Sequence, residues 1–285
     1  MVTLLLPWAV VYAVFFLFPF VFSFVLAFLN YNPLNVQNTT WAGFENFARL
    51  FDDERFLRSL RNTLLFVMGT VPMTTVAALG LAVLLRGRLP GKSILKAGFF
   101  LPSIISMVVI SLVFKLFYSP AGGLNNALSL FGVGGHGWLT DPATALGAIM
   151  IMDVWAAVGY YAIIFDAAFA GIPREMYEAA ELEGAGFKDT LRYVTIPMLR
   201  PVIAFVLVIN TIRSFQIFIE VFVMTQGGPL GATDTLVLYL YESAFRGLDY
   251  GYASAIAYVV FILSGIFSIV VVRRFRPQFG SGGVA

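Results

Sequence analysis

The chain has 285 residues, of which 59% are hydrophobic and 12% charged, and it carries a net charge of +2. Soluble domains carry roughly 25% charged residues, so this composition excludes a soluble fold, and the small net charge argues against nucleic-acid binding. The absence of cysteine rules out disulfides and thiolate chemistry. We expect a single membrane domain over residues 1–285.

Six apolar stretches are long enough to cross a bilayer, which takes about 20 helical residues. They cover residues 4–29, 60–85, 94–117, 143–169, 201–224 and 252–272. The first has neither the basic flank nor the cleavage site of a signal peptide, so we interpret it as a retained helix. Lipid offers backbone groups no hydrogen-bond partner, and the alternation of a membrane β-barrel is absent. The sequence therefore predicts an all-α membrane protein with six transmembrane helices.

Basic residues predict the orientation of these spans, because cytoplasmic loops carry an excess of Lys and Arg. The loops after the second and fourth spans and the C-terminal tail hold Arg86, Arg88, Lys92, Lys96, Arg174, Lys188, Arg192, Arg200, Arg273, Arg274 and Arg276. The opposite side holds Arg49, Arg55, Arg58, Arg61, Lys115 and Arg246. The bias places loop 170–200 and the C-terminus in the cytoplasm.

Loop 170–200 concentrates acidic residues in a chain that has few of them. Five of the 16 acidic side chains fall within it: Glu175, Glu178, Glu181, Glu183 and Asp189. Concentration of charge in one internal loop of a membrane protein indicates that the loop binds a water-soluble partner. A solvated loop without a partner has the same charge pattern.

Proline and glycine predict the local structure of this loop. Pro173 suits the first turn of a helix over 174–185, which Gly184 and Gly186 can end with positive φ. We expect a second short helix over 187–196, after which Pro197 and Pro201 redirect the chain into the fifth span. The product is a compact helix–turn–helix on the cytoplasmic face.

The same loop resembles the EAA coupling motif of binding-protein-dependent ABC importer permeases, through Glu178-Ala179-Ala180, Gly184 and the Pro197-x-x-x-Pro201 close. Segments 41–47, 119–126 and 225–229 resemble those of sugar permeases, so the resemblance covers essentially the whole chain. It implies the type I ABC importer permease fold with a cytoplasmic coupling-helix loop. It also implies a set of residues that contact the ATPase: Glu178, Ala179, Ala180, Glu183, Gly184, Ala185 and Pro197. Glu183 departs from the family, which more often has Asp.

The resemblance further implies which activities this chain lacks and which partners it has. It is expected to be a non-catalytic subunit that binds no cofactor, since ATP and Mg²⁺ belong to separate ATPase subunits. The implied partners are a second homologous permease, two ABC ATPases, an extracytoplasmic solute-binding protein and the lipid of a bacterial cytoplasmic (inner) membrane.

Charged side chains inside the spans are costly and usually face the bundle interior or a water-filled cavity. Asp153 and Asp166 lie in the fourth span, and Arg213 and Glu220 in the fifth. They could pair and merely hold the bundle together, or they could line a translocation path. A sugar suits such a path, because hydroxyls exchange hydrogen bonds and aromatic faces stack on sugar rings.

Comparison with the maltose importer's permease implies a substrate path on the two helices that flank the coupling loop. Together with nearby polar and aromatic residues, the predicted path is Asp153, Trp155, Ala157, Tyr160, Asn210, Arg213, Ser214, Gln216, Ile217 and Glu220. Ile217 departs from the polar residue expected and Asp153 replaces an amide, and both departures argue against maltose itself. Arg213 could favour an anion such as glycerol phosphate, or it could be neutralised by Asp153 or Glu220.

Other functions have weaker support in the sequence. An ion-gradient-driven secondary transporter of a small polar solute predicts inverted repeats and discontinuous helices, and neither is evident. Gly91-Lys92-Ser93 lacks the upstream glycine of a P-loop. The single histidine, His136, lies in a Gly-rich loop, where a spacer role fits better than metal binding. We find neither a nucleophile–base pair nor a set of metal ligands.

Overall fold

The computed structural model describes residues 2–87 and 90–275. Two residues used in the charge bias, Arg88 and Arg276, lie outside the described residues. Within the described part of the chain, five helices are long and apolar enough to cross a membrane, and one bent pair makes a sixth. The prediction of an all-α protein with six spans is therefore confirmed.

Of the five continuous spans, all but the Phe187–Phe215 helix lie close to the predicted ranges. The first joins α1 (Val2–Tyr12), a π-helical turn at Ala13–Leu17 and α2 (Phe18–Leu26). The others are α4 (Glu54–Arg86), α8 (Ala145–Ala170), a helix over Phe187–Phe215 that ends as α11 (Ile196–Phe215), and α14 (Tyr250–Phe275).

Two of the predicted spans are broken. The stretch 94–117 is divided into α5 (Lys92–Ile104) and α6 (Met107–Phe117), which meet at 101°. The stretch 201–224 ends its long helix at Phe215 and restarts as α12 (Ile219–Met224). Hydropathy missed both breaks because the average over a whole span stays apolar despite the few polar residues at each break, Ser103 and Ser106 at the first and Gln216 at the second. The expectation of continuous helices is wrong at these two places.

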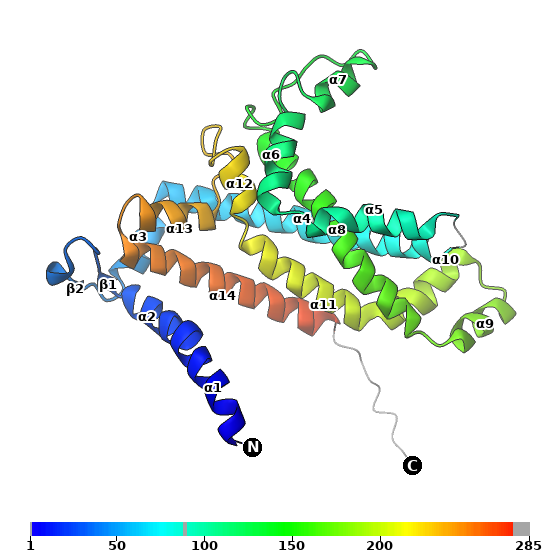
Figure 1. Ribbon diagram of the computed structural model, residues 1–285, viewed down its shortest axis with the longest axis horizontal. Coiled ribbons are helices and arrows are strands. Elements are labelled where there is room, and N and C mark those ends of the chain that lie inside the picture. The colour runs from blue at the N-terminus through cyan, green and yellow to red at the C-terminus, as the bar shows by residue number, and fades with distance from the viewer. Residues whose placement is uncertain (1, 88–89, 276–285) are drawn as a thin grey trace.

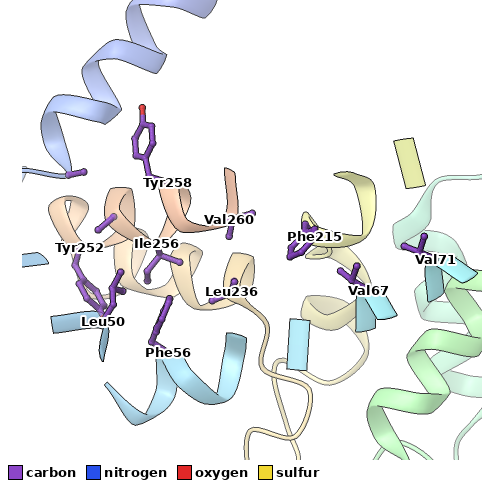
Figure 2. Packing of buried hydrophobic residues seen from close by; sticks show 12 residues of the cluster. Leu50, Phe56, Val67, Val71, Phe215, Leu236, Tyr252, Ile256, Tyr258 and Val260 are labelled. Carbon is purple, nitrogen blue, oxygen red and sulfur yellow. The ribbon is translucent and has the colours of Figure 1, made fainter. Parts of the chain in front are cut away.

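One of the buried hydrophobic clusters forms where α4 and α14 meet the short helices α3 (Glu45–Asp52) and α13 (Leu236–Phe245). Figure 2 shows Leu50, Phe56, Leu236, Tyr252 and Ile256 gathered between these helices. The same cluster extends along α4 to α11 (Figure 2), where the ring of Phe215 is fully buried. Burial of this apolar surface holds the N-terminal ends of α4 and α14 together.

The first span lies apart from the bundle. In Figure 1, α1 and α2 project away from the other helices, and only 6% of this span's apolar window is buried. Its attachment to α14 includes a hydrogen bond in which the Tyr258 hydroxyl donates to the Phe20 carbonyl oxygen at 2.7 Å. Its exposed aromatic side chains therefore require lipid or another subunit as a cover.

Short elements close the ends of the bundle. β1 (Leu29–Asn30) pairs antiparallel with β2 (Thr40–Trp41), and α7 (Gly123–Ser129) projects on the loop that follows α6 (Figure 1). The turn containing α9 (Arg174–Leu182) and α10 (Phe187–Asp189) lies at the opposite end from α3 in Figure 1. The fold thus separates an acidic turn at one end from the two helix breaks.

Candidate coupling turn and translocation path

The acidic turn is built by a helix that ends at a left-handed glycine. Gly184 has φ +75°, and the Gly184 N–H donates to the Glu181 carbonyl oxygen at 3.0 Å. The Ala185 N–H donates to the Ala180 carbonyl oxygen at 2.9 Å. These two bonds form a Schellman motif, which satisfies the last carbonyls of α9. The prediction of a positive φ at Gly184 is confirmed, and α9 ends three residues earlier than expected.

The second half of the turn differs from the prediction. Gly186 has φ −73° and is the N-cap of α10, so the positive φ expected there is wrong. The helix that starts at Phe187 does not stop before Pro197 but continues to Phe215. A π-helical turn at Thr190–Thr195 precedes Pro197, which has no N–H to donate. That local adjustment allows the helix to pass through proline, so Pro197 and Pro201 do not redirect the chain.

The tip of the turn is exposed while its base is packed. Glu178, Ala179, Glu183 and Gly184 are exposed. Two apolar side chains of the turn are exposed as well, Leu182 at the end of α9 by 90% and Phe187 at the start of α10 by 71%.

At the base, the Arg86 guanidinium lies 4.2 Å from the centroid of the Tyr177 ring and 5.2 Å from that of Phe169. Ala180 and Ala185 are half-buried, and Pro197 sits apart from them in the first turn of α11. The turn is therefore a fixed protrusion with an uncovered tip.

An ion cluster joins α8, α11 and α12. Arg213 Nη2 lies 2.7 Å from Asp153 Oδ1 and 3.8 Å from Glu220 Oε1. Asp153 is 3% exposed and Glu220 is 8% exposed, while the Arg213 side chain is 36% exposed. Buried carboxylates at such sites need a paired cation, and Arg213 supplies it. The sequence left this pairing open, and the structure shows Arg213 paired with both carboxylates.

Arg213 also lines two cavities, one at each helix break. The first has a volume of about 400 Å³ and is bordered by Ser103 and Ile105 of the α5–α6 break and by Ala157 and Tyr160 of α8. The second, of about 750 Å³, is bordered by Gln216, Ile217, Phe218, Ile219 and Glu220 at the α11–α12 break. Non-helical backbone at membrane depth is tolerated where protein covers it or where it lines a water-filled cavity. The Thr235 hydroxyl donates to the Ile217 carbonyl oxygen at 3.3 Å, which covers part of one break.

The structure does not gather every predicted path residue here. Asn210 and Ser214 face α4, where the Asn210 amide donates to the Val71 carbonyl oxygen at 3.4 Å and Ser214 bonds Thr70 at 3.3 Å. Trp155 packs against Phe114 and lines a different, apolar cavity.

The remaining acidic residue of the fourth span, Asp166, pairs with Lys96 of α5. It therefore belongs to the packing of α5 against α8. Of the predicted set, the structure brings together Asp153, Ala157, Tyr160, Arg213, Gln216, Ile217 and Glu220. Among the described residues, no group of three or more potential ligands is arranged to hold a metal ion.

Sequence reasoning missed a polar network at the α3 and α13 end. Asp53 caps α4 and accepts hydrogen bonds from the hydroxyls of Tyr239 and Tyr252. Burial alone would raise the pKa of Asp53, but these bonds and two backbone N–H groups hold it below its usual value. Arg55 pairs with Asp234, whose pKa burial raises. The sequence placed Arg55 only in a charge count, because its partners are about 180 residues away.

The comparisons with known proteins agree with this architecture. Residues 54–279 match the family described as the binding-protein-dependent transport system inner membrane component. The lactose transport system permease protein LacF of Rhizobium radiobacter is 37% identical over 236 residues, covering 81% of this chain and 79% of that protein. The trehalose/maltose transport system permease protein MalF of Thermococcus litoralis is 32% identical over 276 residues, covering 96% and 93%.

A solved structure has the same fold. It is a crystal structure of a bacterial ABC transporter involved in the import of the acidic polysaccharide alginate, and it matches with a TM-score of 0.85 at 24% identity, covering 98% of this chain and 95% of that one. The family match excludes the secondary transporter, although broken helices of the kind it predicts are present. The chain belongs to the family of inner-membrane components of binding-protein-dependent transport systems, the permeases of ABC importers.

Proposed function

We propose that this chain is one of two permease subunits of a carbohydrate importer in a bacterial cytoplasmic membrane. The cavities at Arg213 form this subunit's half of the solute path. The relatives described as lactose and trehalose/maltose permeases support a sugar as the solute. The observation that carries the proposal is Arg213, which joins the cavities at two broken helices while its charge is held by Asp153 and Glu220.

The acidic turn provides the link to ATP. Its tip exposes Glu178 and Glu183 for basic groups of an ATPase, and Leu182 and Phe187 for apolar ones. A rigid protrusion transmits movement better than a flexible loop, and the Schellman bonds at Gly184 keep this one rigid. We propose that two separate ATPases bind ATP and Mg²⁺ and move the turn, which lies in the cytoplasm with the C-terminus.

A direct path connects the turn to the cavities. The helix that begins at Phe187 beside the turn runs without interruption to Phe215, two residues beyond Arg213. Displacing α9 therefore displaces the residue that joins the two cavities. A solute-binding protein on the other side of the membrane would deliver the sugar, as the family description implies.

The test of the turn is charge reversal at Glu178 in the complete transporter. Glu178→Lys should abolish co-purification of the ATPases and ATP-driven sugar uptake, because it opposes the basic partner groups. Gly184→Asp should have the same effect, because an L-residue at φ +75° strains the turn. The matched control is Asp52→Lys, an exposed reversal in α3 at the opposite end of the bundle. Normal ATPase association in both turn variants would refute the proposal.

A further inference from the structure

We propose that the cavities at Arg213 accept uncharged hydroxylated solutes and reject anions. This inference rests on the proposed function, because it concerns the solute that passes through the same site. An arginine in a transport cavity suggests anion recognition when it is considered alone. The neighbours of this arginine reverse that expectation.

The charges at the site leave no positive charge for a ligand. Among the described residues that line the two cavities, Arg213 is the only cation. It faces two carboxylates, Asp153 at 2.7 Å and Glu220 at 3.8 Å. The cluster has a net charge of −1 when both carboxylates are ionised and is neutral when one of them holds a proton. An incoming phosphate or carboxylate meets no surplus positive charge in either case.

An anion that took the Asp153 side of Arg213 would have to displace a buried carboxylate. Asp153 is 3% exposed, and its described hydrogen-bond partner is Arg213. Moving the guanidinium onto a ligand would leave this buried carboxylate unpaired, which is strongly unfavourable. A ligand that stayed near Glu220 instead would meet a like charge. Both positions therefore select against anions.

The same geometry suits a neutral hydroxylated solute. A guanidinium has five N–H donors, and both carboxylates contact a single nitrogen, Nη2. The Arg213 side chain is 36% exposed, so part of it can donate to hydroxyl oxygens without releasing Asp153. Tyr160, which is 48% exposed, lines the smaller cavity, where its ring can cover an apolar sugar face, and the exposed Gln216 lines the larger one. The two carboxylates act through Arg213, as positioning residues.

The experiment compares matched neutral and anionic probes on the assembled complex of this chain, its partner permease and the ATPases, without the binding protein. Equilibrium dialysis measures the dissociation constants of glucose and trehalose against those of glucose 6-phosphate and trehalose 6-phosphate. Each neutral sugar should bind at least about 10-fold more tightly than its phosphate, because a like charge a few ångströms away opposes the phosphate. Glu220→Gln should tighten binding of the phosphates by about 10-fold or more and so reduce the preference for each neutral sugar over its phosphate.

The matched control is Asp166→Asn, which removes a carboxylate of α8, the helix of Asp153. Asp166 pairs with Lys96 and lines neither cavity. This variant should leave the ratio of neutral to phosphate binding unchanged. If Glu220→Gln fails to assemble, Asp153→Asn replaces it. Phosphate binding as tight as or tighter than neutral binding in the wild type would overturn the charge inference alone. Binding of neither probe by the wild type would instead refute the proposed sugar path.

Discussion

Replacing Arg213 should destabilise the complex, and neutralising its partners should undo that damage without restoring transport. At the 2.7 Å separation of Arg213 and Asp153, two unit charges attract by about 6 kcal/mol at an effective dielectric of about 20. Desolvation offsets part of this attraction. We therefore expect Arg213→Met alone to cost about 3–5 kcal/mol, the typical result of leaving a buried charge unpaired.

A triple variant separates stability from transport. Combining Arg213→Met with Asp153→Leu and Glu220→Met removes all three charges, so no buried charge is left without a partner. Replacing a complete buried ion cluster with apolar residues of similar volume is often neutral or stabilising. The triple variant should therefore unfold near the wild-type temperature, while its uptake stays at least about 10-fold below wild type because donors of a charged group are lost.

Two assays on the same preparation decide between the alternatives. Thermal unfolding of the purified complex measures stability, and sugar uptake into proteoliposomes measures transport. If the cluster only holds the bundle together, the triple variant will recover both properties. Wild-type uptake by a stable triple variant would refute the assignment of Arg213 to the path.

Three further perturbations test other parts of the structure. A Cβ at Gly159 would lie 1.8 Å from the Phe99 carbonyl oxygen, so Gly159→Ala should force α5 away from α8 and cost about 1–3 kcal/mol. Gly147→Ala, also in α8 but with no described atom beyond the helix's own backbone within 4 Å of the new Cβ, should leave the unfolding temperature unchanged or raise it, because alanine favours a helix over glycine. The pKa of Asp53 in the folded protein lies below its unfolded value of about 4. The ionised carboxylate should therefore stabilise the fold above that pH, and this contribution should be lost as the pH falls. A pH series of unfolding temperatures in which Asp53→Ala matches wild type at neutral pH would contradict this. Arg86→Gln removes two cation–π contacts at the base of the turn, worth about 0.5–1 kcal/mol each. A more loosely held turn should transmit movement less well, so the amount of ATP hydrolysed per sugar imported should increase. An unchanged ratio would show that Arg86 does not contribute to this transmission.

Composition and local chemistry predicted the spans and the glycine turn because both depend on neighbouring residues. The length of the apolar stretches located both ends of α8 and α14, and the C-terminal end of α4, within a few residues. The positive φ at Gly184 was predictable because glycine has no Cβ and therefore adopts this conformation without steric strain. Both arguments need no knowledge of distant contacts.

The helix breaks and the fate of Pro197 could not be predicted in the same way. The break at Ile105 lies in a span that is apolar on average, and hydropathy is equal for a straight and a bent helix of the same sequence. The expectation that Pro197 redirects the chain ignored the π-helical turn before it. The Arg213–Asp153 pair spans 60 residues of sequence, so only the packing of α8 against α11 selects it from several possible pairs.

The most direct test of the path is the accessibility of a cysteine at position 216. The chain has no native cysteine, so Gln216→Cys gives one reactive site on this subunit, which mass spectrometry can identify in the assembled transporter. We predict that a water-soluble thiol reagent added on the binding-protein side labels it after ATP trapping and not in the nucleotide-free state. Phe15→Cys, at an exposed position of the first span, should show no dependence on nucleotide. Equal labelling of Gln216→Cys in both nucleotide states would contradict a path through the α11–α12 break.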